Sequence, residues 1–296
     1  MGSAGGSMPD EVAFDDSGLC RWTDEERFVV TPERVAEYAA ATNDPIEAHR
    51  SGAAAPPVFA IVPVFDAMLS PAVDVMPVEL IPRVVHGEQD FRFHRAIRPG
   101  EELLSRAKMI GYEGLPNGTR ATILMECRSL DGELVNEQYA TCFVRKFDAG
   151  KKVGELGPGH KFDAGLRGQA PVAKVTQHVD ADQTFRYAQA SGDPMPVHLD
   201  EEVAKAAGLP GIIAHGLCTM AFASWALLTE LADSDVNRLK RFAVRFSKMV
   251  LPGDDIETHI WRTGSSAGVT SFAFETVRGE DLVLTDGLAE IADLKN

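Results

Sequence analysis

The sequence lacks the features of a nucleic-acid-binding or membrane-spanning protein. Lys and Arg number 29 against 44 Asp and Glu, and the net charge of −15 repels a polyanion unless positive side chains gather in one place. The longest apolar run, residues 217–228, has about 12 residues, whereas a bilayer span needs about 20. We therefore expect no nucleic acid and no membrane as a partner.

Cysteine is also scarce. Four widely spaced cysteines, Cys20, Cys127, Cys142 and Cys218, form no CxxC motif, which argues against a disulfide framework and against a zinc site. No apolar signal segment follows a basic start, and residues 1–7 read as a tail or a cloning remnant. The sequence predicts thiols in a reducing, cytoplasmic compartment, with no metal and no other cofactor.

The chain does contain enough apolar sequence, 45% of 296 residues, for one large or two ordinary domains. Thr31, Pro32 and Glu33 predict an N-cap and a helix over residues 32–41. Residues 217–228 predict a helix that is apolar all round and must be enclosed. Alternating patterns and turn residues predict strands at 28–30, from Val84, and at 103–110, 121–127 and 136–144.

An internal repeat organises the chain. Residues 38–45 (YAAATNDP) match residues 187–194 (YAQASGDP), and His49 follows Asp44 at the same distance as His198 follows Asp193. Each half therefore predicts a helix, a loop, a longer helix and an antiparallel meander. The glycine-rich stretch 148–169 predicts a linker between a half spanning 9–147 and a half spanning 170–296.

The halves differ where chemistry would be expected. The apolar segment 58–68 carries Pro63, which shortens or kinks a helix, whereas residues 217–228 have no such break. The pair His215-Gly216 of the second half falls on Ile61-Val62 in the first. We expect the second half to be catalytic and the first, degenerate half to leave space beside its shortened helix for part of the substrate pocket, including an acyl chain.

Asp193, His198 and Gly216 suit the addition of water to a polarised double bond. Such a reaction needs a base for the water proton, an acid for the alpha carbon and donors for the enolate oxygen. His198 is the better base and Asp193 the better acid or water-orienting group, while the Gly216 N–H at a helix start supplies a donor. The spacing alone is weak evidence, and loop capping is the alternative.

This arrangement resembles the MaoC-like hydratases and dehydratases, which include the R-specific enoyl-CoA hydratases (hydratase 2). The family motif stands here as Tyr187 through Gly192-Asp193 to His198 and Asp200, followed by His215-Gly216. The resemblance implies an α+β double hotdog fold, in which each half wraps an antiparallel sheet around a helix.

The resemblance also implies an activity, the reversible hydration of trans-2-enoyl thioesters to R-3-hydroxyacyl thioesters. Asp193 and His198 would act on water, and Gly216 would donate to the oxyanion. One residue departs from the family pattern, because Met195 stands where the family has an asparagine that contacts the substrate and water.

Several roles have two interpretations at this stage. His215 either contacts the substrate, with Gly216 and Met195, or packs at the helix entry. Asp44 and His49 favour a structural role, because no His-Gly pair follows them. The other histidines, His86, His94, His160, His178 and His259, have no partner at a telling distance and are expected on the surface or on strands.

Two other functions compete with hydration, a hotdog thioesterase and a non-catalytic binding subunit. The substrate is expected to be an acyl thioester, on CoA or on an acyl carrier protein. The sequence specifies neither the chain length nor the pathway, and it leaves monomer and homodimer open.

Overall fold

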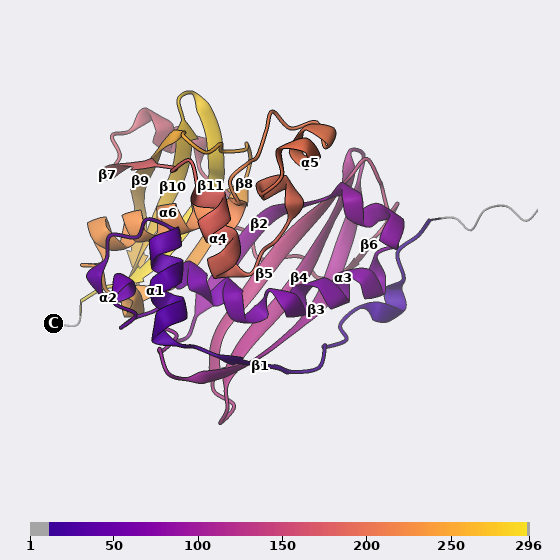
Figure 1. The fold of residues 1–296 in the computed structure, drawn as a ribbon, viewed down its shortest axis with the longest axis horizontal. Helices are drawn as coiled ribbons and strands as arrows, with labels where there is room; N and C mark the ends of the chain where they lie inside the picture. Colours follow the sequence, from indigo (N-terminus) through magenta and orange to yellow (C-terminus); the bar gives the residue numbers. More distant parts are fainter. Residues whose placement is uncertain (1–11, 295–296) are drawn as a thin grey trace, which may run out of the picture.

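One antiparallel sheet runs through both halves of the chain (Figure 1). The computed structural model describes residues 12–294; the expected tail at 1–7 and residues 9–11 of the first half lie outside them. The strands are β1 (Glu26–Val29), β2 (Val84–Phe93), β3 (Glu102–Leu115), β4 (Gly118–Ser129), β5 (Leu134–Arg145), β6 (Lys152–Gly154), β7 (Ala173–His178), β8 (Leu239–Phe246), β9 (Asp255–Ser266), β10 (Val269–Arg278) and β11 (Asp281–Ala292).

The strand order confirms the double hotdog. It is β1-β3-β4-β5-β2-β8-β11-β10-β9-β7, so the second half repeats the order of the first in reverse around a central β2–β8 pair. At this seam Glu88 lies opposite Arg245 and Phe91 opposite Phe242. The short strand β6 pairs with β3 beside the main path.

Helices cover the concave face of each half. The α-helices are α1 (Pro32–Ala41), α2 (Glu47–Arg50), α3 (Leu69–Val75), α4 (Gln183–Ser191), α5 (Glu201–Ala206) and α6 (Gly216–Leu231). The 3₁₀ segments are η1 (Asp16–Gly18), η2 (Pro57–Val64), η3 (Asp66–Met68), η4 (Val78–Arg83), η5 (Ala164–Gly168), η6 (Pro196–His198) and η7 (Val236–Arg238). The helix predicted over 32–41 is confirmed as α1, capped by the Thr31 hydroxyl, which accepts from the Arg34 N–H at 3.2 Å.

The enclosed helix of the second half is α6. Eleven of its 16 residues are buried, because the curved strands β7 to β11 lie behind it (Figure 1). This agrees with the apolar-all-round pattern, which a surface helix would not carry.

The matching segment of the first half is broken. Residues 57–64 form the 3₁₀ segment η2, and the following helical segment Asp66–Val75 is bent away from it by 63°. Pro63 has no N–H and so cannot pair with the carbonyl of Ala60, which instead accepts from Gln138 Nε2 at 2.6 Å. All eight residues of η2 are buried, so a place for an acyl chain beside it stays a prediction.

The stretch predicted as a linker is held against both halves. It contains β6 and η5, and Arg167 forms two hydrogen bonds with the Glu275 carboxylate, at 2.9 and 2.7 Å. The Phe162 N–H donates to Asp286 Oδ1 at 2.9 Å. The exact limits of the two domains stay a prediction.

The two halves also meet through helices. The buried hydroxyls of Tyr38, on α1, and Tyr187, on α4, lie 3.3 Å apart. In Figure 1 these two helices lie side by side, left of the centre of the view.

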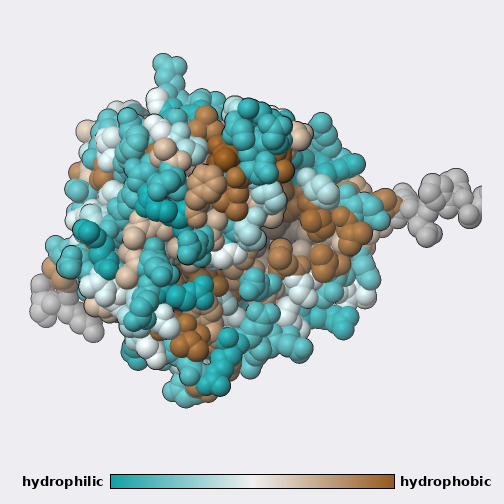
Figure 2. Space-filling model, viewed as in Figure 1, coloured by the Kyte–Doolittle hydropathy of each residue, from teal (hydrophilic) through white to brown (hydrophobic). Residues whose placement is uncertain are grey.

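Apolar surface is uneven. Exposed apolar side chains include Leu69, Val73, Val78 and Ile81 of α3 and η4, and Figure 2 shows apolar surface on the side of this face where Figure 1 places α3. In the described part of the chain, no single helix is long and apolar enough to cross a membrane, although the bent pair formed by η2 and the Asp66–Val75 segment passes that test by length and composition.

Candidate active site

The loop after α4 carries the first site residue. Gly192 ends α4 in the left-handed conformation, at φ +82°, which suits glycine because it has no Cβ. The chain then turns so that Asp193 Oδ1 accepts the backbone N–H of Met195 at 3.1 Å. This Asx-type turn fixes the direction of the carboxylate.

His198 lies at the end of η6, and the backbone fixes its protonation pattern. Its Nδ1 lies 2.8 Å from the carbonyl oxygen of Ile213. A carbonyl can only accept, so Nδ1 carries the proton and Nε2 of the neutral ring keeps its lone pair. The imidazole is thus ready to accept a proton.

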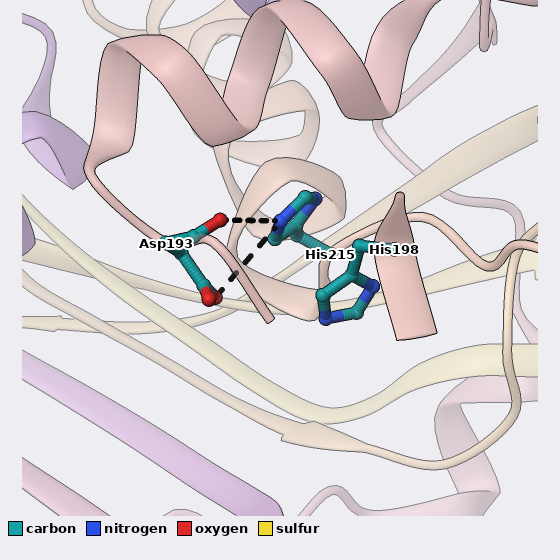
Figure 3. Close-up of side chains that lie close together, drawn as sticks. All are labelled: Asp193, His198 and His215. Atoms are coloured by element: carbon teal, nitrogen blue, oxygen red, sulfur yellow. Dashed lines mark hydrogen bonds and ion pairs between the residues drawn. The ribbon is translucent and has the colours of Figure 1, made fainter. Parts of the chain in front are cut away.

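Asp193, His198 and His215 converge. One polar atom from each of the three side chains lies within 4.8 Å of the others, and Figure 3 shows the carboxylate and the two rings around one space. The same three side chains could in principle hold a metal ion, and the sequence-based expectation of no metal stays a prediction.

Burial shifts the two predicted acid–base groups in opposite directions. Loss of solvent raises the pKa of Asp193, partly offset by the Met195 N–H and by His198. Loss of solvent lowers the pKa of His198, partly offset by the Ile213 carbonyl and by Asp193. Both shifts favour the uncharged forms, a neutral imidazole and a carboxyl that holds its proton more tightly.

His215 is the N-cap residue of α6 and lies beneath the pair, with 2% of its surface exposed. Its Nε2 lies 3.3 Å from the backbone oxygen of Asp193 and 4.0 Å from Oδ2 (Figure 3). Its ring stacks on that of His198, with centroids 3.8 Å apart. Burial, and then the neighbouring His198, lower its pKa to about 3, so it is neutral near pH 7 and contributes shape and a hydrogen bond.

Gly216 opens α6. Within residues 12–294 its N–H donates to no backbone or side-chain acceptor, as expected for the first N–H of a helix. A Cβ at this position would lie 3.0 Å from Cδ1 and 3.1 Å from Cε1 of Phe246. Glycine therefore lets the Phe246 ring pack directly on the backbone that carries the free donor.

Met195 contributes its backbone to the site. Its side chain is 53% exposed, while its N–H holds Asp193. A substrate role for this side chain, or for that of His215, stays a prediction.

The first half contains a corresponding Asp–His pair, in which the two side chains bond to each other. Asp44 and His49 are both buried, with His49 Nδ1 2.7 Å from Asp44 Oδ2. The other oxygen of Asp44 accepts the Ile46 N–H at 2.9 Å. The geometry fits the predicted structural role.

His86 was not singled out from the sequence. It lies on β2, as expected for a strand histidine, but its ring is half-buried and packs on Phe246, with centroids 4.9 Å apart. A one-residue register shift opposite β5, between His86 and Glu88, interrupts the strand's alternation. Sequence periodicity could not reveal that shift.

Comparison with known proteins finds a dehydratase-type family model for each half. The MaoC like domain family matches residues 164–282, and the FAS1-like dehydratase domain region matches residues 18–138. The chain is 31% identical over 215 residues to the probable enoyl-CoA hydratase 2 of Dictyostelium discoideum, covering 72% of this chain and 71% of that protein. It is 33% identical over 226 residues to the 3-hydroxyacyl-thioester dehydratase Y of Mycobacterium tuberculosis, covering 70% and 72%.

A third relative is much longer. The chain is 29% identical over 212 residues to the peroxisomal multifunctional enzyme type 2 of Mus musculus, and the match covers 71% of this chain but 28% of that enzyme.

Solved structures agree on the fold. The MaoC-like dehydratase of Phytophthora capsici superimposes with a TM-score of 0.80 at 22% identity, covering 92% of this chain and 96% of that one. A Mycobacterium tuberculosis protein described as a double hotdog gives a TM-score of 0.60 at 16% identity, covering 93% and 96%. With the relatives above 30% identity, these matches show that the chain belongs to the MaoC-like hydratases and dehydratases.

Proposed function

We propose that the protein catalyses the reversible hydration of trans-2-enoyl-CoA to R-3-hydroxyacyl-CoA. The observation that carries the proposal is the convergence of Asp193 and His198 in the half whose helix begins with the free N–H of Gly216. The relatives named enoyl-CoA hydratase and 3-hydroxyacyl-thioester dehydratase support the same hydro-lyase reaction.

The proposed steps conserve atoms and charge. His198 Nε2 takes a proton from water as the water oxygen forms a bond to the beta carbon. The electron pair of the carbon–carbon double bond shifts to form an enolate double bond between the alpha carbon and the thioester carbon, and the carbonyl π pair moves onto the thioester oxygen. The Gly216 N–H, at the positive end of α6, stabilises that oxyanion. Asp193 then gives its proton to the alpha carbon, and return of the proton from His198 to Asp193 restores both groups.

The supporting residues follow from their contacts. His215 holds the Asp193 backbone and stacks under His198, so in this proposal it orients both groups. Met195 orients Asp193 through its N–H. We propose CoA as the carrier because the relatives are named for enoyl-CoA.

The direct test follows the loss of enoyl-thioester absorbance with crotonyl-CoA, with free thiol measured in the same reaction. Hydration predicts absorbance loss without thiol release and an R-configured product on chiral chromatography. Thiol release would instead indicate a thioesterase, and no turnover across a chain-length series would indicate a binding subunit. Sedimentation of the purified protein distinguishes a monomer from a homodimer. The homodimer and the cytoplasmic location both stay predictions.

A further inference from the structure

His86 of the first half lies one aromatic ring away from the oxyanion donor of the second. Its ring meets that of Phe246 edge to face, at 62° and 4.9 Å between centroids. The same Phe246 ring lies against Gly216, where an added Cβ would lie 3.0 to 3.4 Å from three carbons of the ring. The order of contacts is therefore His86, Phe246, Gly216, across the seam between β2 and β8.

His86 is itself held in place by a buried polar chain. Its Nε2 lies 3.0 Å from Oε1 of Gln89, and the Gln89 amide donates to Oε1 of Gln138 at 3.3 Å. Gln138 donates in turn to the carbonyl of Ala60 in η2 at 2.6 Å. Both glutamines are fully buried, so turning the imidazole would leave the buried Gln89 oxygen without its hydrogen-bond donor.

This arrangement affects the Gly216 N–H because α6 begins at Gly216, where the Phe246 ring packs. The Phe246 ring packs against the first residue of α6, and the direction of the Gly216 N–H depends on where that first turn rests. We propose that His86 is a positioning residue of the first half, which holds Phe246 against Gly216 and thereby aims the Gly216 N–H at the thioester oxygen. The inference rests on the proposed hydratase function and gives the degenerate half a part in catalysis.

The first test compares two substitutions at His86. His86→Ala removes the ring and should lower kcat with crotonyl-CoA by about 10- to 100-fold, the effect expected when a reacting group is misplaced by about 1 Å. KM should change by less than about threefold, because the donor acts mainly in the transition state. His86→Phe keeps the ring but leaves Gln89 Oε1 without its donor, so it should lose stability and keep kcat.

The matched control is His94→Ala, which removes a half-exposed histidine from the end of the same region, beyond β2. It should leave kcat, KM and the melting temperature unchanged. A role for His86 in stability alone predicts the reverse pattern, with kcat following the folded fraction in both His86 variants, and that result would overturn the inference.

A double-mutant cycle tests the mechanism directly. Gly216→Ala places a methyl group 3.0 Å from Phe246. The Phe246 ring cannot move away from this methyl group while His86 packs against it. Removing His86 should let the ring withdraw, so the double variant should lose less activity than the product of the two single losses. Multiplicative losses would refute the proposed chain of contacts.

A single substitution covers the case in which His86→Ala does not fold. Phe246→Leu should reproduce the loss in kcat, because it removes the aromatic ring that packs on Gly216. If Phe246→Leu is as active as the wild type, the inference fails. A wild-type protein that hydrates no enoyl-CoA would instead overturn the proposed function, and the two failures are therefore distinguishable.

Discussion

His49 Nδ1 lies 2.7 Å from Asp44 Oδ2 in the first half, and both side chains are buried. In the second half the corresponding Nδ1 of His198 turns to the carbonyl of Ile213 instead. The two halves thus use the same residues at the same spacing in two ways. In one pair the two side chains bond to each other, and in the other the imidazole bonds to the backbone, which leaves its Nε2 available for proton transfer.

This contrast predicts that the first pair acts on stability. His49→Leu leaves the buried Asp44 carboxyl without its partner, and we expect the free energy of unfolding to fall by about 1–3 kcal/mol. The kcat of the folded fraction should stay within about threefold of wild type. Urea denaturation and crotonyl-CoA kinetics on the same preparation check both parts, and a loss of kcat at full folding would show that the first half has kept its own chemistry.

The second pair should show the opposite behaviour. Asp193→Asn and His198→Gln each remove proton transfer while keeping similar volume, so kcat should fall by about 10²- to 10⁴-fold. The melting temperature should not fall, because burial already disfavours the charged forms of both groups. Less than about a tenfold change in either variant would rule out the catalytic assignment.

Two histidines with lowered pKa values, His86 and His215, predict lower stability in mild acid. Burial lowers the pKa of His86 to about 4 and that of His215 to about 3, from an ordinary value of 6.5. Below pH 6.5 the unfolded chain binds protons that the folded chain does not, so the free energy of unfolding falls as the pH falls, until each folded pKa is reached.

The slope is about 1.4 kcal/mol per pH unit for each proton that differs between the states. His86→Phe removes one such group and should flatten the dependence of the urea midpoint on pH below 6.5, whereas His94→Ala should not. An unchanged slope in His86→Phe would mean that His86 titrates normally in the folded protein.

Met195→Asn tests the departure from the family pattern. The side chain is 53% exposed, so stability should change by no more than about 0.5 kcal/mol. The backbone N–H that holds Asp193 is kept, and the new amide adds a polar contact for the substrate and its water. We expect kcat to rise, and an unchanged or lower kcat would show that Met195 does not limit turnover.

The sequence predicted the architecture well, for a physical reason. The repeated Tyr-to-His segment marks corresponding points of two copies of one fold, and local signals such as the Thr31 cap set α1 to the residue. An apolar-all-round pattern can be satisfied only by enclosure, which is what α6 shows.

Other features depend on contacts that are distant in the chain. The hydrogen bonds that join His86 to Gln89, and Gln89 to Gln138, depend on the pairing of β2 with β5 and its shifted register. The glycine-rich stretch 148–169 suggested a linker, yet residues far away in sequence, Glu275 and Asp286, fasten it. Nor does spacing reveal that Nδ1 of His49 points to Asp44 while Nδ1 of His198 points to Ile213.

The pairing of β2 with β8 has a consequence for assembly. A C-terminal half produced alone would expose β8 as an open edge, with Phe242 and its neighbours no longer opposite β2. Open edges tend to pair with another chain, and two copies could restore the sheet by joining β8 to β8 about a twofold axis. Covalent fusion replaces that association, which depends on concentration, with one that survives dilution. In the fused chain one copy of the Asp–His pair, Asp44 and His49, can then serve stability alone.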